Sequence, residues 1–205
     1  MPSAAVATDW VEPAPVPPND QNVLVHGVSW AGYCLMRELL DSPGIRLAYL
    51  EGALEITSPS PRHEFLKTQI ARLLEVFSLE RGVALIGYGS TTFRREARER
   101  GLEPDECYCV DRELGEAPDI AIEVVLTSGG LNKLSIYAGL GVREVWFWQG
   151  AGFRLYRLNA DGTSYESVVK SELVPGLDFE ELATFVREPN QYAAALGFRA
   201  RLRGE

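Results

Sequence analysis

An acid stands in the middle of an apolar run, residues 120–125, whose other members are isoleucine, alanine and valine. Such a run predicts a buried strand, in which side chains alternate between the two faces of a sheet. Glu123 therefore shares a face with Asp119, and the two isoleucines face the core on the other side. A buried acid is costly unless it is paired or binds a metal. The chain is expected to fold around a sheet that carries a functional carboxylate.

Two Pro-Asp pairs supply further acids near this strand, at Asp105 and Asp119. Asp119 and Glu123 are separated by roughly 13 Å along an extended strand. Because Mg²⁺ binds its ligands at about 2 Å, one ion is not easily held by both of these acids. We therefore expect Asp105, on a neighbouring strand, to be the partner of Glu123. Asp119 is interpreted as a turn-forming residue after Pro118.

A lysine and a tyrosine follow on a predicted helix. Lys133 and Tyr137 are spaced i, i+4 and so share a helix face. A lysine there could point back at the end of the strand, where it would orient an attacking water or stabilise charge on a phosphate. Two strand acids and a lysine are the groups that a metal-dependent phosphodiesterase needs. The alternative is a solvated lysine near a helix start.

Other candidates lie earlier in the chain, where a long predicted helix follows two strands. His63 shares a helix face with Lys67 and could contact a phosphate or assist proton transfer. The alternative for His63 is a capping or surface residue. Glu51 and Glu55 share a strand face, so either could add an acid to a metal site, or both could face water.

Apolar periodicity predicts a chain in which helices and strands are interspersed. Helices are expected over residues 29–40, 60–80, 131–140, 178–186 and 191–201. Strands are expected over residues 46–51, 53–57, 83–88, 91–94, 105–110, 119–126, 145–148, 153–158 and 165–170. This order predicts an α/β fold on the border of α+β, with a mixed sheet flanked by helices.

Length and composition fit a single domain, because 205 residues are enough to bury a core. Prolines at positions 13, 15, 17 and 18 predict an extended arm over residues 1–24. A domain over residues 25–190 and a C-terminal helix or tail over residues 191–205 are expected to follow. The apolar runs are too short to span a membrane, so no membrane partner is expected.

Charge and cysteine content narrow the class of protein. The net charge of −9 argues against a general nucleic-acid coat, but it leaves room for a nuclease with a local basic rim. The arginines between residues 94 and 100 alternate with acids and predict a solvated turn. Three cysteines without a disulfide framework predict reduced thiols and a cytoplasmic protein. Cys107 and Cys109 share a strand face and are interpreted as buried apolar residues rather than half of a zinc site.

Several motifs occur together in a fixed order. They are Leu50-Glu51-Gly52, Ser58-Pro59-Ser60-Pro61-Arg62-His63, Glu103-Pro104-Asp105-Glu106, Ala117-Pro118-Asp119-Ile120-Ala121-Ile122-Glu123-Val124, Lys133-Leu134-Ser135-Ile136-Tyr137 and Gly141-Val142-Arg143-Glu144-Val145-Trp146. With these motifs the chain resembles the Uma-two family of putative restriction endonucleases, within the PD-(D/E)xK nuclease superfamily. The resemblance covers roughly residues 25 to 190.

The resemblance implies a restriction-endonuclease-like core with a site that uses Mg²⁺ or Mn²⁺ and acts on DNA. On this pattern Asp105 and Glu123 look like the two strand acids that bind the metal. Lys133 looks like the family's lysine, and His63 falls on its helix position. The superfamily's usual place for the lysine is Val125 in this chain, so Lys133 is a substitute from the helix.

The early hairpin also departs from the family pattern, because this chain has Ala53 where family members often carry an acid. Glu51 is the candidate to replace that acid as a metal ligand, and Glu55 is the alternative. Asp119 and Tyr137 remain secondary candidates for the site.

Two functional hypotheses follow. The first is a metal-dependent endonuclease that hydrolyses phosphodiester bonds of DNA. The second is a catalytically weak or inactive nuclease-like fold that acts as an interaction or structural protein. A homodimer is the commonest assembly, and the aromatic residues between 146 and 153 could form a dimer surface or, alternatively, a buried strand. A small-molecule hydrolase is not supported, because the chain lacks a Gly-x-Ser-x-Gly motif.

Overall fold

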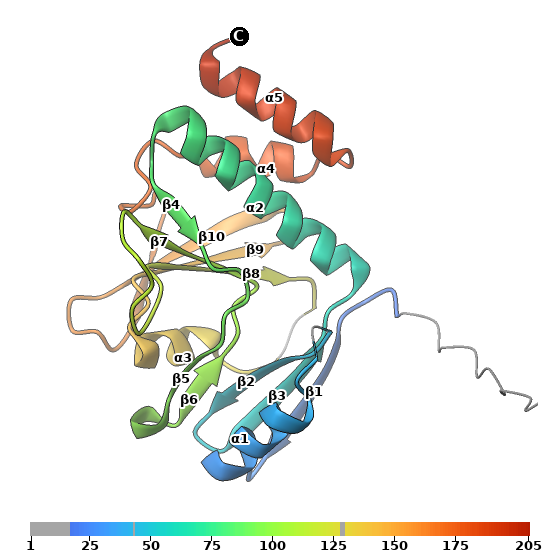
Figure 1. Ribbon diagram of the computed structural model, residues 1–205, viewed down its shortest axis with the longest axis vertical. Coiled ribbons are helices and arrows are strands. Elements are labelled where there is room, and N and C mark those ends of the chain that lie inside the picture. Colours follow the sequence, from blue (N-terminus) through green and yellow to red (C-terminus); the bar gives the residue numbers. More distant parts are fainter. Residues whose placement is uncertain (1–16, 43, 128–129) are drawn as a thin grey trace, which may run out of the picture.

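The computed structural model describes residues 17–42, 44–127 and 130–205, which form two sheets with helices in layers around them (Figure 1). The helices are α1 (Trp30–Leu39), α2 (Pro61–Arg81), α3 (Lys133–Leu140), α4 (Phe179–Val186) and α5 (Gln191–Arg203). Helices α2 and α4 cover one face of a six-stranded sheet, and α5 packs on these two helices. Helix α3 packs between the other face of that sheet and a five-stranded sheet, and α1 packs against the five-stranded sheet.

The six-stranded sheet holds the acidic strand in its interior. Its order is β11–β10–β9–β8–β7–β4. The strands are β4 (Leu85–Gly87), β7 (Glu106–Val110), β8 (Ile120–Val125), β9 (Glu144–Gln149), β10 (Gly152–Leu158) and β11 (Tyr165–Val168). Strands β8 and β9 run parallel, and the other neighbours are antiparallel. Parallel neighbours need a crossover, which α3 supplies between β8 and β9.

The five-stranded sheet has the order β1–β3–β2–β6–β5. Its strands are β1 (Gln21–His26), β2 (Arg46–Leu50), β3 (Ala53–Ser58), β5 (Phe93–Arg95) and β6 (Arg100–Leu102). The predicted mixed helix-and-strand fold of a single domain is confirmed, with a second sheet that the sequence did not predict. Two of the strands that complete this sheet, β1 and β6, were not recognised. The predicted charged turn is a short 3₁₀ helix (Glu96–Arg98) between β5 and β6.

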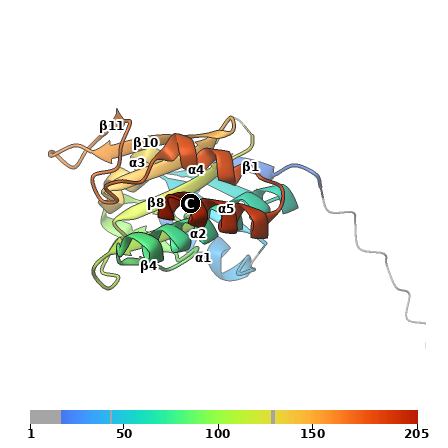
Figure 2. The same ribbon diagram turned by 90° about the horizontal axis from the view of Figure 1, so that it is seen from above.

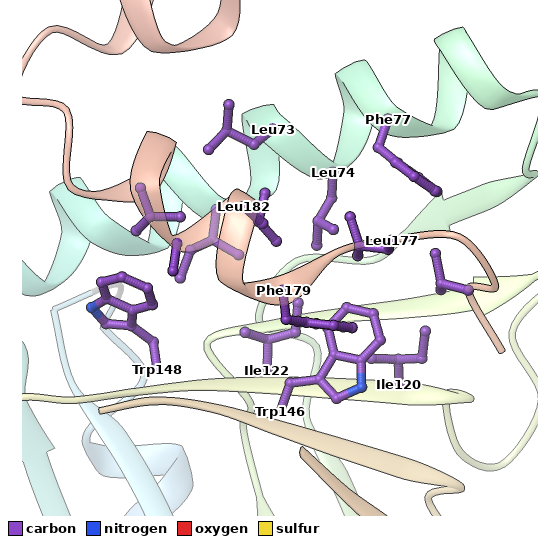
Figure 3. Packing of buried hydrophobic residues seen from close by; sticks show 14 of the residues in the cluster. Leu73, Leu74, Phe77, Ile120, Ile122, Trp146, Trp148, Leu177, Phe179 and Leu182 are labelled. Carbon is purple, nitrogen blue, oxygen red and sulfur yellow. The ribbon is translucent and has the colours of Figure 1, made fainter. Parts of the chain in front are cut away.

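The main core lies between α2 and the six-stranded sheet (Figure 3). Leu74 of α2 and Ile122 of β8 point into it, and Trp146 of β9 meets Phe179 of α4 edge-on with ring centroids 4.8 Å apart. Burying a large apolar side chain contributes about 1.5–3 kcal/mol. Trp146 and Trp148 are therefore core residues, so the buried strand is confirmed for them and the alternative of a dimer surface is not.

Local signals place α2 as predicted. The hydroxyl of Ser60 accepts a hydrogen bond from the backbone N–H of His63 at 3.3 Å, and Pro61 occupies the first helical turn. Gly82 ends the helix in a left-handed conformation, with φ of 65°. The start of α2 matters for function because His63 follows directly after this cap.

Residues near both ends of the described chain belong to the fold. The boundary predicted between residues 24 and 25 passes through β1, which pairs with β3 along Gln21–His26. Residues 1–16 of the predicted arm lie outside the described residues. The predicted C-terminal tail is α5, which lies against α2 and α4 (Figure 2). None of the helices in the described part of the chain combines the length and apolar character needed to cross a membrane.

Candidate active site

Strand pairing brings Asp105 and Glu123 together. Strands β7 and β8 are antiparallel, with Cys107 opposite Ala121 and Glu106 opposite Ile122. Continuing this register by one residue puts Asp105 opposite Glu123. The backbone N–H of Val124 donates a 2.7 Å hydrogen bond to Oδ2 of Asp105, which fixes that carboxylate at the strand edge. Both residues are buried, with Asp105 4% exposed and Glu123 0%.

Helix α3 delivers two donors to Glu123. Nζ of Lys133 lies 2.6 Å from Oε2 of Glu123, and the hydroxyl of Tyr137 donates to Oε1. Asn132 caps the helix by accepting from the backbone N–H of Ser135 at 3.3 Å, so Lys133 is the first helical residue. The predicted i, i+4 face of Lys133 and Tyr137 thus points at the acid, and Lys133 is not a solvated surface residue.

A second chain of contacts runs from Asp105 through α2 to the segment before β1. Nε2 of His63 forms an ion pair with Oδ1 of Asp105 at 2.9 Å, and Nδ1 contacts Oδ2 of Asp20 at 3.0 Å. The other oxygen of Asp20 accepts the backbone N–H of Ser60 at 2.8 Å. His63 is 4% exposed, so its interpretation as a surface residue was wrong. The histidine instead holds two carboxylates in place.

The charges of this cluster shift its acid–base equilibria. Burial raises the pKa of Glu123; the ammonium of Lys133 offsets part of this effect and the charge of Asp105 adds to it. Burial would also raise the pKa of Asp105, but contact with His63 outweighs it and lowers that pKa. Burial would lower the pKa of Lys133, but Glu123 and Asp105 raise it above its usual value. The cluster therefore keeps the lysine protonated.

His63 is a second strongly perturbed base of the cluster. Burial would lower its pKa, but the carboxylates of Asp105 and Asp20 outweigh this effect and raise the pKa to about 9. The imidazole is therefore a cation at neutral pH. Neighbouring Glu106 also titrates near neutrality, because burial raises the pKa of its carboxyl to about 7.

Glu55 and Glu51 have separate environments. Glu55 is 5% exposed, and its Oε2 accepts the backbone N–H of Leu131 at 3.2 Å. A side chain at Gly130, where φ is 103°, would meet the Glu55 carboxylate. Glu51 instead lies in the β2–β3 turn and forms an exposed ion pair with Arg100 at 2.9 Å. Of these two sequence candidates, Glu55 is therefore the one that faces the cluster.

Asp119 does not join the cluster. Its carboxylate accepts the backbone N–H of Val110 at 2.9 Å and pairs with Arg112 at 2.9 Å and Arg143 at 3.5 Å. These contacts connect the residue just before β8 to β7, to the segment after β7 and to the loop before β9. The expectation that Asp119 shapes the chain near Pro118, away from Glu123, agrees with this placement.

A cavity of about 330 Å³ opens beside the cluster. Glu55, His63 and Lys133 contribute to its lining, together with Asp20 from the N-terminal side. An adjoining recess is lined by Asp105 and reaches the same histidine and lysine. Asp105 and Lys133 therefore face these spaces, whereas Glu123 is 0% exposed and contacts Lys133 from within the protein.

The donor chemistry fits a magnesium ion held by few protein ligands. Within residues 17–42, 44–127 and 130–205, no group of three or more His, Cys, Asp or Glu side chains is placed to hold a metal. Mg²⁺ commonly uses one or two carboxylates and keeps several waters. Each carboxylate has about four lone-pair positions; Val124 and His63 use two at Asp105, and Lys133 and Tyr137 use two at Glu123. The buried charge of Glu123 would also be stabilised by a cation.

Sequence reasoning missed Asp20. Its side chain is 5% exposed and lies one residue before β1, far from the other acids in sequence. The prolines just before it indicate an extended arm, and no periodicity marks the residue. The Asn19-Asp20 pair at the end of the proline-rich stretch was the available signal, and it is typical of ordinary loops.

The family comparison matches most of the chain. The family model described as "Uma2: Putative restriction endonuclease" matches residues 30–186. Among solved structures, the chain is similar to a putative nuclease belonging to DUF820 from Anabaena variabilis. That match has 16% sequence identity and a TM-score of 0.49, and it covers 74% of this chain and 98% of the other. No curated protein matches the chain.

Proposed function

The chain belongs to the Uma2 family of putative restriction endonucleases, and from this membership we propose that it is a metal-dependent endonuclease acting on DNA. The observation that supports this proposal best is the cluster of Asp105, Glu123 and Lys133. Two buried carboxylates and an ammonium meet between the six-stranded sheet and α3, beside an open cavity. Such a group suits phosphodiester hydrolysis, because that reaction needs a held cation and stabilisation of developing negative charge.

Asp105 and Glu123 are the residues that would hold Mg²⁺ or Mn²⁺. When bound there, a divalent ion supplies polarisation of the phosphate and a water of lowered pKa. Lys133 orients Glu123 and presents an ammonium that can donate to the attacking water or to a phosphate oxygen. Tyr137 holds the other oxygen of Glu123. His63 acts as a positioning residue, because both its ring nitrogens contact carboxylates.

A second candidate is an inactive nuclease-like fold that serves as a binding or structural protein. One observation favours it: both oxygens of Glu123 are bonded to protein donors, Lys133 and Tyr137. In that case the lysine neutralises the buried acid permanently, and no cation is needed. The two candidates differ in whether the cluster binds a divalent ion.

Calorimetric titration with Mg²⁺ and with Mn²⁺, beside a cleavage assay on DNA, separates the candidates. The wild type is expected to bind an ion and cleave, and Asp105→Asn or Glu123→Gln is expected to abolish both. Asp119→Asn is the matched control, because Asp119 is a buried acid paired with arginines outside the cluster. A wild type that binds neither ion and cuts no DNA would overturn the nuclease proposal in favour of the inactive fold.

A further inference from the structure

Part of the cavity beside the acids is lined by residues that the proposed hydrolysis does not use. Phe147 and Gln149 of β9 and Tyr156 of β10 form one section of the lining, and Asn22 of β1 and Asn132 contribute elsewhere. These side chains carry no formal charge. They combine aromatic rings with amides, and this composition indicates a ligand that is flat and polar at its edges.

The sheet register puts this section directly beside the acid. Strands β8 and β9 run parallel, with Glu123 opposite Phe147 and Val125 opposite Gln149. Paired residues on neighbouring strands point to the same face of a sheet. The aromatic ring is therefore the next side chain along the sheet from the proposed metal ligand. A group bound against Phe147 would be adjacent to the bond that is cut.

The chemistry of the wall suits a nucleobase. Phe147 and Tyr156 lie edge-on, with ring centroids 5.7 Å apart and an interplanar angle of 86°. Aromatic side chains bind unpaired bases by stacking, and side-chain amides hydrogen-bond to base edges. Within the part of the chain that the structure describes, the Gln149 amide has no side-chain hydrogen-bond partner, so both its donor and its acceptor are available.

The volume of the cavity and the charges of its lining favour a small ligand over a run of phosphates. The volume of about 330 Å³ lies at the lower end of the range, about 300–1,000 Å³, in which proteins bind small ligands. The lining includes the carboxylates of Asp20 and Glu55 beside the ammonium of Lys133, so it carries no excess of cations. A run of phosphates needs an excess of cations, whereas a neutral ring does not.

We propose that this cavity holds one unpaired nucleobase of the DNA substrate, next to the phosphate that is attacked. This inference rests on the proposed nuclease function and specifies its substrate as DNA with an accessible base, either single-stranded or locally opened. Phe147 and Tyr156 supply the stacking surface. Gln149 reads the edge of the base, and the protein thereby positions the neighbouring phosphate toward Glu123.

The test compares short single-stranded oligonucleotides with an abasic chain of the same length and phosphate count. The abasic chain lacks a base at every position. It therefore offers no base to the cavity, whichever of its nucleotides lies there. Fluorescence anisotropy in EDTA and in Ca²⁺ measures affinity without relying on cleavage. At least one base-bearing oligonucleotide is expected to bind about tenfold more tightly than the abasic chain.

Variants locate the effect. Phe147→Leu removes the ring, and Gln149→Ala removes an exposed amide at little risk to folding; each is expected to reduce the preference for bases. Tyr192→Leu is the control, because it removes an exposed aromatic ring on α5. Equal binding of base-bearing and abasic chains would overturn the base pocket and leave the nuclease function standing. Binding of neither single strand would overturn the base pocket, and failure of a duplex to bind as well would overturn the nuclease function.

A duplex of the same sequence completes the experiment. If the pocket takes an unpaired base, the duplex is expected to bind more weakly than the single strand, unless it contains a mismatch that frees a base. Tighter binding of the perfect duplex, with no effect of Phe147→Leu, would contradict the proposal.

Discussion

The ammonium of Lys133 lies 2.6 Å from the carboxylate of Glu123, although the two residues belong to a helix and a strand. The crossover from β8 to β9 explains this contact, since α3 begins near the end of β8 and returns along the sheet. Val125, two residues after Glu123, shares its strand face but is apolar. Lys133 of α3 thus supplies the positive charge that β8 itself lacks.

Replacing this lysine tests its part in the chemistry. Lys133→Met is expected to lower the rate of DNA cleavage by about a hundredfold or more, because an oriented donor to the reacting group is lost. Single-turnover cleavage measures the effect. Lys170→Met is the matched control, because Lys170 is exposed and distant in sequence from the site. Cleavage at the wild-type rate by Lys133→Met would contradict the assigned role.

Tyr137→Phe removes one hydrogen bond from a buried carboxylate. The free energy of unfolding is expected to fall by about 1.5–3 kcal/mol, as is typical for hydrogen bonds to charged groups. Cleavage should fall as well, because Glu123 loses its second fixed contact.

Tyr165→Phe is the matched control for this change, since its hydroxyl donates to the carbonyl of Val142 away from the acids. It is expected to cost about 1 kcal/mol in urea unfolding and to leave cleavage unchanged. Equal loss of cleavage in both variants would indicate a general effect of stability rather than a role for Tyr137.

The pairing of His63 with two acids predicts a pH dependence of stability. Its pKa rises from 6.5 to about 9 on folding, because the two carboxylates outweigh the effect of burial. The stabilisation is therefore complete below pH 6.5 and is lost as pH rises through about 9.

Asp20→Asn removes one of these acids and should lower the folded-state pKa of His63. We expect the free energy of unfolding at pH 7 to fall by about 1–2 kcal/mol, and the difference from wild type to shrink at pH 9.5. Urea unfolding at several pH values measures both. Asp161→Asn, a change at an exposed hairpin residue, should leave this part of the pH profile unaltered. A difference that is constant from pH 6 to 9.5 would contradict the linkage.

The two acids of the β2–β3 hairpin are expected to differ in their effect on metal binding. Glu55→Gln removes a buried negative charge that acts on Lys133, so the affinity for Mg²⁺ should fall roughly five- to tenfold. Glu51→Gln, at an exposed turn residue, should leave the affinity unchanged. Isothermal titration compares the pair, and a larger loss in Glu51→Gln would reverse the assignment.

Much of the fold was predictable because its signals are local. Caps such as Ser60 and Gly82 place the ends of α2, and the apolar run around Glu123 identifies β8. Strand β1 was missed because all six of its residues are exposed, so no apolar alternation marks it. Strand β6 has only three residues, Arg100–Leu102, with Gly101 at its centre, and its pairing with β2 and β5 is a tertiary property.

The site was predictable to the extent that its members lie on regular elements. Strand spacing separates Asp119 from Glu123 and points to Asp105, and helix spacing pairs Lys133 with Tyr137. Asp20 was not accessible to this reasoning, because it reaches His63 only through the pairing of β1 with β3. Its contact is a consequence of long-range sheet formation, and nothing within its own segment encodes it.

The placement of Asp20 has a practical consequence for anyone who shortens this chain. Composition suggests that residues up to 24 can be trimmed as a dispensable leader. A product that starts at residue 25 would lose four of the six residues of β1 together with the carboxylate on His63. The shortened protein could still fold around its core and yet show no activity. The effect of the truncation would then be mistaken for a lack of activity in the full chain.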